Sequence, residues 1–178
     1  MKTTTIITLL VGVLFVLIST TAHAQAFENW DIRKGSSSGV KHAKTAVWGE
    51  RLNELGYPLT GMLSALGYTC RGPNAERLVV FYSNPINAHV ESRRRLNRIP
   101  VRINVDGQNL STSFYQESGS REMFANELDT ELLSTRFSIA NSATIAVQWH
   151  GKDEPALFRY DLSGFSEAVG EAQGHCSR

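Results

Sequence analysis

The end of the chain, from Leu157 to Cys176, constrains the fold most, because a strand, a helix and a cysteine follow one another there. Residues 156–162 alternate apolar and polar side chains, which is the period of a strand with one buried face. Apolar residues then recur at helical spacing at Phe165, Ala168, Val169 and Ala172. Ser163 stands where an N-cap belongs and Gly174 where a helix would stop. The one possible partner of Cys176 within the chain is Cys70.

The first segment predicts export. Lys2 precedes an apolar run over residues 6–18, and Ala22-His23-Ala24 supplies a small-x-small cleavage site. We therefore expect a signal peptide at 1–24, with a signal anchor as the alternative. The run is shorter than the ~20 residues that span a bilayer, so we expect no stable membrane insertion. The compartment would be periplasmic or secreted, and an even pair of cysteines there predicts a disulfide.

Residues 25–178 have the length of one ordinary domain. The whole chain has 18 Lys and Arg against 17 Asp and Glu, and cleavage after residue 24 would remove one lysine and no acid. The mature chain is then formally neutral. This balance argues against a dedicated nucleic-acid binder, which is usually strongly basic.

Alternation predicts a series of short strands. They fall at residues 27–32, 44–49, 66–71, 78–82, 101–106, 110–114, 144–149 and 157–162. Asp106-Gly107 predicts a hairpin turn, and residues 66–82 form a second hairpin. We interpret GSSSG at 35–39 as a loop and leave 50–61 unassigned, because Gly56 and Pro58 interrupt its helical spacing.

Residues 123–133 predict an amphipathic helix, with Phe124, Leu128 and Leu132 four apart and acidic residues between them. The fold class expected is mainly β: an antiparallel β-sandwich with one or two peripheral helices. The C-terminal helix would be tethered to a central strand by the Cys70–Cys176 disulfide.

Catalytic patterns are weak. GSSSG matches a G-x-S-x-G nucleophile elbow, but no hydrophobic strand enters it and no helix leaves it. The mature histidines are separated from one another and from the cysteines, so no metal-ligand spacing occurs: His42, His89, His150 and His175. The acidic pairs at 129/131 and 153/154 do not resemble a glycosidase pair. We expect no enzyme, metal or cofactor.

Two groups are candidates for binding. The densest charge cluster consists of Arg93, Arg94, Arg95 and Arg98. It could dock an anion or an acidic protein surface, although a solvated connection that protects a sheet edge from aggregation is the favoured interpretation. His150, beside Trp149 at a strand end, is the second candidate.

The tail from Ala143 to Cys176 resembles the VasI-like exported accessory proteins associated with type VI secretion systems. The residues that match are Phe158 or Tyr160, Asp161, Gly164, Ala168, Cys176 and Cys70, and VRINVDG at 101–107 is similar to the central hairpin of that family. The chain differs in having GSSSG after its first strand. The resemblance implies a secretion accessory without catalytic residues.

Two functions remain. The first is an exported, non-enzymatic envelope protein that binds a protein partner, which the balanced charge and the absence of catalytic spacing favour. The second is an exported inhibitor or immunity-type protein that blocks a hydrolase with a loop such as 85–98.

Overall fold

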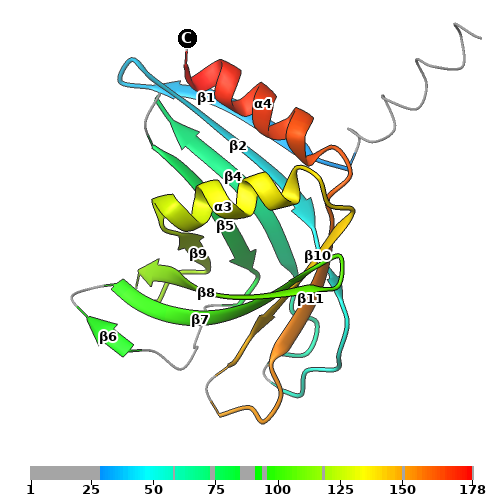
Figure 1. Cartoon of the computed structure of the whole chain (residues 1–178). Helices are drawn as coiled ribbons and strands as arrows, with labels where there is room; N and C mark the ends of the chain where they lie inside the picture. The colour runs from blue at the N-terminus through cyan, green and yellow to red at the C-terminus, as the bar shows by residue number, and fades with distance from the viewer. Residues whose placement is uncertain are drawn as a thin grey trace, which may run out of the picture.

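The computed structural model describes residues 29–57, 59–72, 75–84, 91–93, 96–117, 119–149 and 151–177, of which 91–93 are described in their backbone alone. The expected signal peptide lies outside these residues. Over these residues the fold is mainly β, with one antiparallel sheet and two helices (Figure 1). Among the described residues, neither helix is long and apolar enough to cross a membrane.

The sheet has eleven strands, in the order β1-β2-β4-β5-β9-β8-β7-β10-β11-β3, with β6 paired to β7. Their bounds are β1 Asp31–Ser37, β2 Val40–Trp48, β3 Glu50–Arg51, β4 Ser64–Arg71, β5 Glu76–Tyr82, β6 Glu91–Arg93, β7 Leu96–Val105, β8 Gln108–Glu117, β9 Glu122–Ala125, β10 Ser142–Val147 and β11 Ala156–Asp161. The helices are α3, Glu127–Phe137, and α4, Phe165–Cys176. Both predicted hairpins, β4–β5 and β7–β8, are confirmed.

The sheet curls until its ends approach each other. β3 follows β2 after Gly49 alone, yet β2 pairs with β4 while β3 pairs with β11. Gly49 N donates to Ser64 O at 2.8 Å, and a Cβ on Gly49 would meet the ring of Tyr160 at 2.5 Å. The expected mainly β antiparallel class is confirmed, and its facing layers are parts of one continuous sheet.

The core lies inside this curl. Tyr82 contacts Trp149 and Phe158 edge-on, with ring centroids 5.2 and 5.7 Å apart. The Ser64 hydroxyl and the Tyr160 hydroxyl lie 2.6 Å apart in a buried hydrogen bond. Burial raises the pKa of both Tyr82 and Tyr160, so both side chains stay neutral at physiological pH.

The C-terminal tether is confirmed. Cys70 on β4 and Cys176 at the end of α4 form a disulfide, with their Cα atoms 6.3 Å apart. The predicted apolar stripe of α4 is buried at Phe165, Ala168, Val169 and Ala172. Its ends differ from prediction: Gly164, with φ 81°, is the N-cap instead of Ser163, and the helix continues through Gly174 because its packing against β2 and the disulfide hold the last turn.

The helix predicted at 123–133 begins later and buries another face. Residues 122–125 form β9, which pairs with β5 and β8, and these ladder bonds prevail over helical spacing. Asn126 caps α3 by accepting a hydrogen bond from Asp129 N at 2.8 Å. The buried side chains are Thr130, Leu133 and Phe137, whereas Leu128 is 79% exposed. The predicted stripe is therefore wrong.

The prediction that 35–39 is a loop is also wrong. Residues 35–37 belong to β1, and the turn is limited to Ser38 and Gly39, both with positive φ. Strands flank the serines on both sides, so the arrangement of a nucleophile elbow is absent from this described segment. In the segment after β3, for which the sequence predicts no element, the Asn53 side chain donates a hydrogen bond to Pro155 O and accepts one from Leu157 N. These two hydrogen bonds attach the segment to the start of β11.

Candidate functional site

The arginine cluster falls only partly within the described residues. Arg94, Arg95 and His150 lie outside them, and Arg93 is described only as a residue of β6 paired with Leu96. Arg98 is exposed on β7, and its Nε donates to Ser113 Oγ at 2.9 Å. The proposed inhibitor loop at 85–98 also lies largely outside the described residues.

Trp149 was expected beside a binding surface, but it lies in the core. Its side chain is buried, and its ring stacks edge-on against Tyr82. In β10 every second side chain is buried, at Ala143, Ile145 and Val147, and Trp149 continues this buried row just past the end of the strand. Trp149 therefore contributes to the core.

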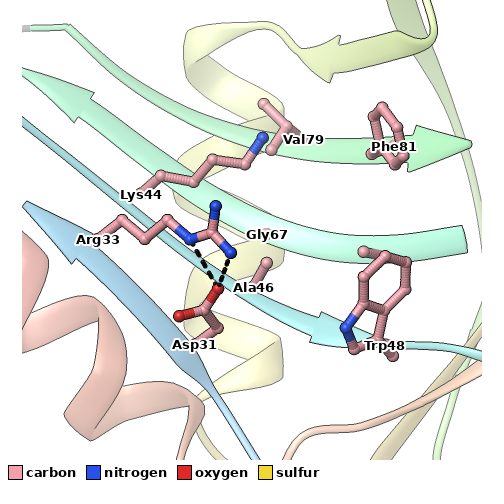
Figure 2. A pocket seen from close by; sticks show the side chains of 9 residues that line it. Asp31, Arg33, Lys44, Ala46, Trp48, Gly67, Val79 and Phe81 are labelled. Atoms are coloured by element: carbon pink, nitrogen blue, oxygen red, sulfur yellow. Dashed lines mark hydrogen bonds and ion pairs between the residues drawn. The ribbon is translucent and has the colours of Figure 1, made fainter.

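The exposed tryptophan is Trp48, at the end of β2, which is 65% exposed. It belongs to the face of β1, β2, β4 and β5 that we call the outer face. The helices contact the opposite face: α4 packs on β2 and β4, and α3 packs on β5. In Figure 2 both helices lie behind these strands, so neither of the described helices covers the outer face.

Strand register arranges the outer face in parallel rows. One row crosses four strands as Arg33, Lys44, Thr69 and Arg77. The next row is mostly small or apolar: Asp31, Ala46, Gly67, Val79 and Phe124. A third contains Trp48, Ala65, Phe81 and Glu122. The face thus changes from cationic to apolar over adjacent rows.

A groove of about 260 Å³ runs along these rows. Its smallest lining residues are Ala46, Ala65 and Gly67. Figure 2 shows Ala46 and Gly67 between the larger side chains of Lys44, Val79 and Trp48. A Cβ at Gly67 would meet Thr45 O at 2.6 Å, so this position excludes a side chain and the floor stays low. We call this depression the outer groove.

Charged side chains border the outer groove. Arg33 pairs with Asp31 at 2.8 Å, and Lys44 pairs with Glu122 at 3.3 Å. The guanidinium of Arg77 lies 4.5 Å from the centre of the Phe124 ring. Exposed ion pairs contribute little net stability, about 0–1 kcal/mol each, so a competing carboxylate can replace either acidic partner.

A second, more polar cavity of about 600 Å³ lies between α3 and α4. At its edge Gln173 Nε2 donates to Tyr68 Oη and to Glu76 Oε2, at 3.0 Å each. Burial, followed by the hydrogen bond and charge of Glu76, raises the pKa of Tyr68, which keeps this hydroxyl protonated. These hydrogen bonds join α4 to β4 and β5. The polar side chains at this edge of the cavity therefore hold the helix on the sheet, and we do not take the cavity as the candidate site.

The described residues contain no group of three or more His, Cys, Asp or Glu side chains placed to hold a metal ion. Comparisons of the chain with protein-family models, with curated proteins and with solved structures find no match. The outer groove is the candidate functional site of the chain.

Proposed function

We propose that this protein is exported and acts by binding another protein of the cell envelope through its outer face. The disulfide supports the compartment, because such bonds persist in oxidising environments. The expected signal peptide at 1–24 supports the same route. On this proposal the chain performs no reaction of its own, in line with the weak catalytic patterns of its sequence.

The exposure of Trp48 is the observation on which the proposal depends. Tryptophan is among the residues that contribute most to protein interfaces, and here it stands beside a groove with a floor of small side chains. The other two tryptophans, Trp30 and Trp149, are instead buried against aromatic rings of the core. A large aromatic side chain kept in water beside a depression is the arrangement of an unoccupied anchor.

The accessory role at a type VI secretion system belongs to the same proposal. It is supported by the resemblance of the tail from Ala143 to Cys176 to VasI-like proteins. The partner would then be a component of that machine exposed on the outer side of the inner membrane.

The proposal is tested by capture from envelope extract with tagged mature protein and two matched variants. Trp48→Ser removes the anchor, and Leu128→Ser removes an equally apolar exposed side chain from α3, behind the sheet. We expect a specific partner to be retained by the wild type and by Leu128→Ser and lost with Trp48→Ser. Equal retention by all three proteins would refute the outer face as the contact surface.

A further inference from the structure

We infer that the outer groove receives an acidic peptide segment of the partner, in which one large apolar side chain stands next to Asp or Glu. This inference rests on the proposed function and adds the chemistry of the segment that is bound. It follows from the shape of the groove, from the charges along its border and from the position of Trp48.

The shape fits a single large side chain. The floor has no side chain at Gly67 and only methyl groups at Ala46 and Ala65. A volume of about 260 Å³ accommodates one aromatic or long aliphatic side chain, and it is below the ~300–1,000 Å³ of common small-molecule pockets. Trp48, Val79 and Phe81 give the groove an apolar side, so the gain comes from removing the guest side chain and the ring of Trp48 from water.

The charges select a carboxylate beside that side chain. Arg33, Lys44 and Arg77 occupy one transverse row, directly next to the groove floor. Asp31 and Glu122 neutralise two of these cations, whereas Arg77 is in contact with the Phe124 ring and forms no ion pair with any of the described residues. A carboxylate of the guest meets a net positive border and can exchange with the exposed acidic partners.

The same pattern disfavours a membrane surface as the guest. Polybasic attachment to anionic lipid generally uses clusters of about 4–8 Lys or Arg. Here three cations are interspersed with Asp31 and Glu122, whose carboxylates repel an anionic bilayer. A depression for one side chain also differs from the flat apolar surface of an interfacial anchor.

Trp48 provides a direct probe, because Trp30 and Trp149 are each only 4% exposed. Acrylamide quenching of the intrinsic fluorescence therefore reports mainly on Trp48. Three synthetic peptides with Gly and Ser flanks form a matched set, with the centres Glu-Phe-Glu, Lys-Phe-Lys and Glu-Ser-Glu. Vesicles of phosphatidylglycerol serve as the lipid probe. We expect only the Glu-Phe-Glu peptide to shield Trp48, and less so as salt rises from about 50 to 500 mM.

Variants are measured by the anisotropy of a labelled Glu-Phe-Glu peptide. Replacing Arg33 and Lys44 together by Ser should weaken binding by about 2- to 25-fold, since one exposed ion pair is worth about 1.4- to 5-fold. Trp48→Ser should weaken it by about 30-fold, as for an interface anchor. Leu128→Ser is the control and should bind like the wild type.

The inference is overturned if the Lys-Phe-Lys or Glu-Ser-Glu peptide binds as well as Glu-Phe-Glu. It is also overturned if vesicles alone shield Trp48, or if no probe does. Trp48-dependent capture of an envelope protein without any binding of the acidic peptide would leave the proposed function standing and reject only this guest. Binding of the acidic peptide without Trp48-dependent capture would reject the proposed function and leave the peptide specificity of the groove standing.

Discussion

Removal of the Cys70–Cys176 disulfide should destabilise the protein strongly. The bond closes a loop with a sequence separation of 106 residues, from the end of β4 to the last turn of α4. In the chain-entropy model, a loop of about 100 residues contributes about 4.7 kcal/mol, an upper figure because the unfolded chain keeps some structure. At ~2–4 °C per kcal/mol for a domain of this size, the melting temperature should fall by about 10–20 °C.

The assay is thermal unfolding, followed by circular dichroism, of the double variant Cys70→Ala/Cys176→Ala and of the wild type with and without reductant. Reduced wild type and double variant should melt at similar temperatures, because both lack the same constraint. Hydrogen exchange should increase first in α4, which the bond joins to β4. A melting temperature within about 2 °C of the oxidised wild type, or two alkylatable thiols in the exported protein, would refute the reasoning.

Three further predictions concern the turn, the groove floor and export. The Asp106 carboxylate accepts from Asn141 N at 2.8 Å and Ser142 N at 2.9 Å, and these hydrogen bonds lower its pKa from the usual value of an aspartate. Because the pKa of Asp106 is lower in the folded state, its carboxylate stabilises the fold above the unfolded pKa, and this stabilisation is lost as the pH falls through the folded pKa. Asp106→Asn should therefore be less stable than wild type near pH 7. Denaturant unfolding should show that the difference in stability between the two proteins disappears in acid. Gly67→Ala should lower the stability by about 1–3 kcal/mol because of its contact with Thr45 O, whereas Gly170→Ala, with open space around it, should be neutral or stabilising; equal melting of the two would contradict the close approach. N-terminal sequencing of the exported protein should begin at Gln25, and an intact N-terminus in the membrane fraction would instead favour the signal anchor.

The sequence predicts correctly those elements whose structure is decided by residues close together in the chain. The β7–β8 hairpin follows from its alternation and from Asp106-Gly107, which takes positive φ at both residues. The apolar stripe of α4 was likewise readable from its spacing. In both cases the residues that interact are close in sequence or share one period.

Prediction failed where distant strands decide the outcome. Phe124 fits the spacing of a helix with Leu128, but β5 and β8 recruit it into β9 by ladder hydrogen bonds. Gly35–Ser37 has little intrinsic strand preference and is held in β1 by pairing with β2. The closure of the curl at Gly49 depends on β11, more than a hundred residues later, and has no local signal.

The candidate site was missed for a related reason. Alternation placed Ala46 and Trp48 on the face opposite Val47, which the structure confirms by the burial of Val47. Alternation gives the two faces of a strand without saying which one a helix will cover. Since α4 contacts the face of Val47, the sequence neighbour Trp48 stays in water.

Site-specific photo-crosslinking in cells tests the outer face as the contact surface most directly. Trp48 and, in a parallel strain, Leu128 are replaced by the photo-crosslinking residue p-benzoylphenylalanine, which reports contacts within a few ångströms of an exposed position. We predict a discrete adduct with one envelope protein from position 48, and none from position 128 on α3. An adduct from position 128 alone, or none from position 48 in a protein that is folded and disulfide-bonded, would contradict the account.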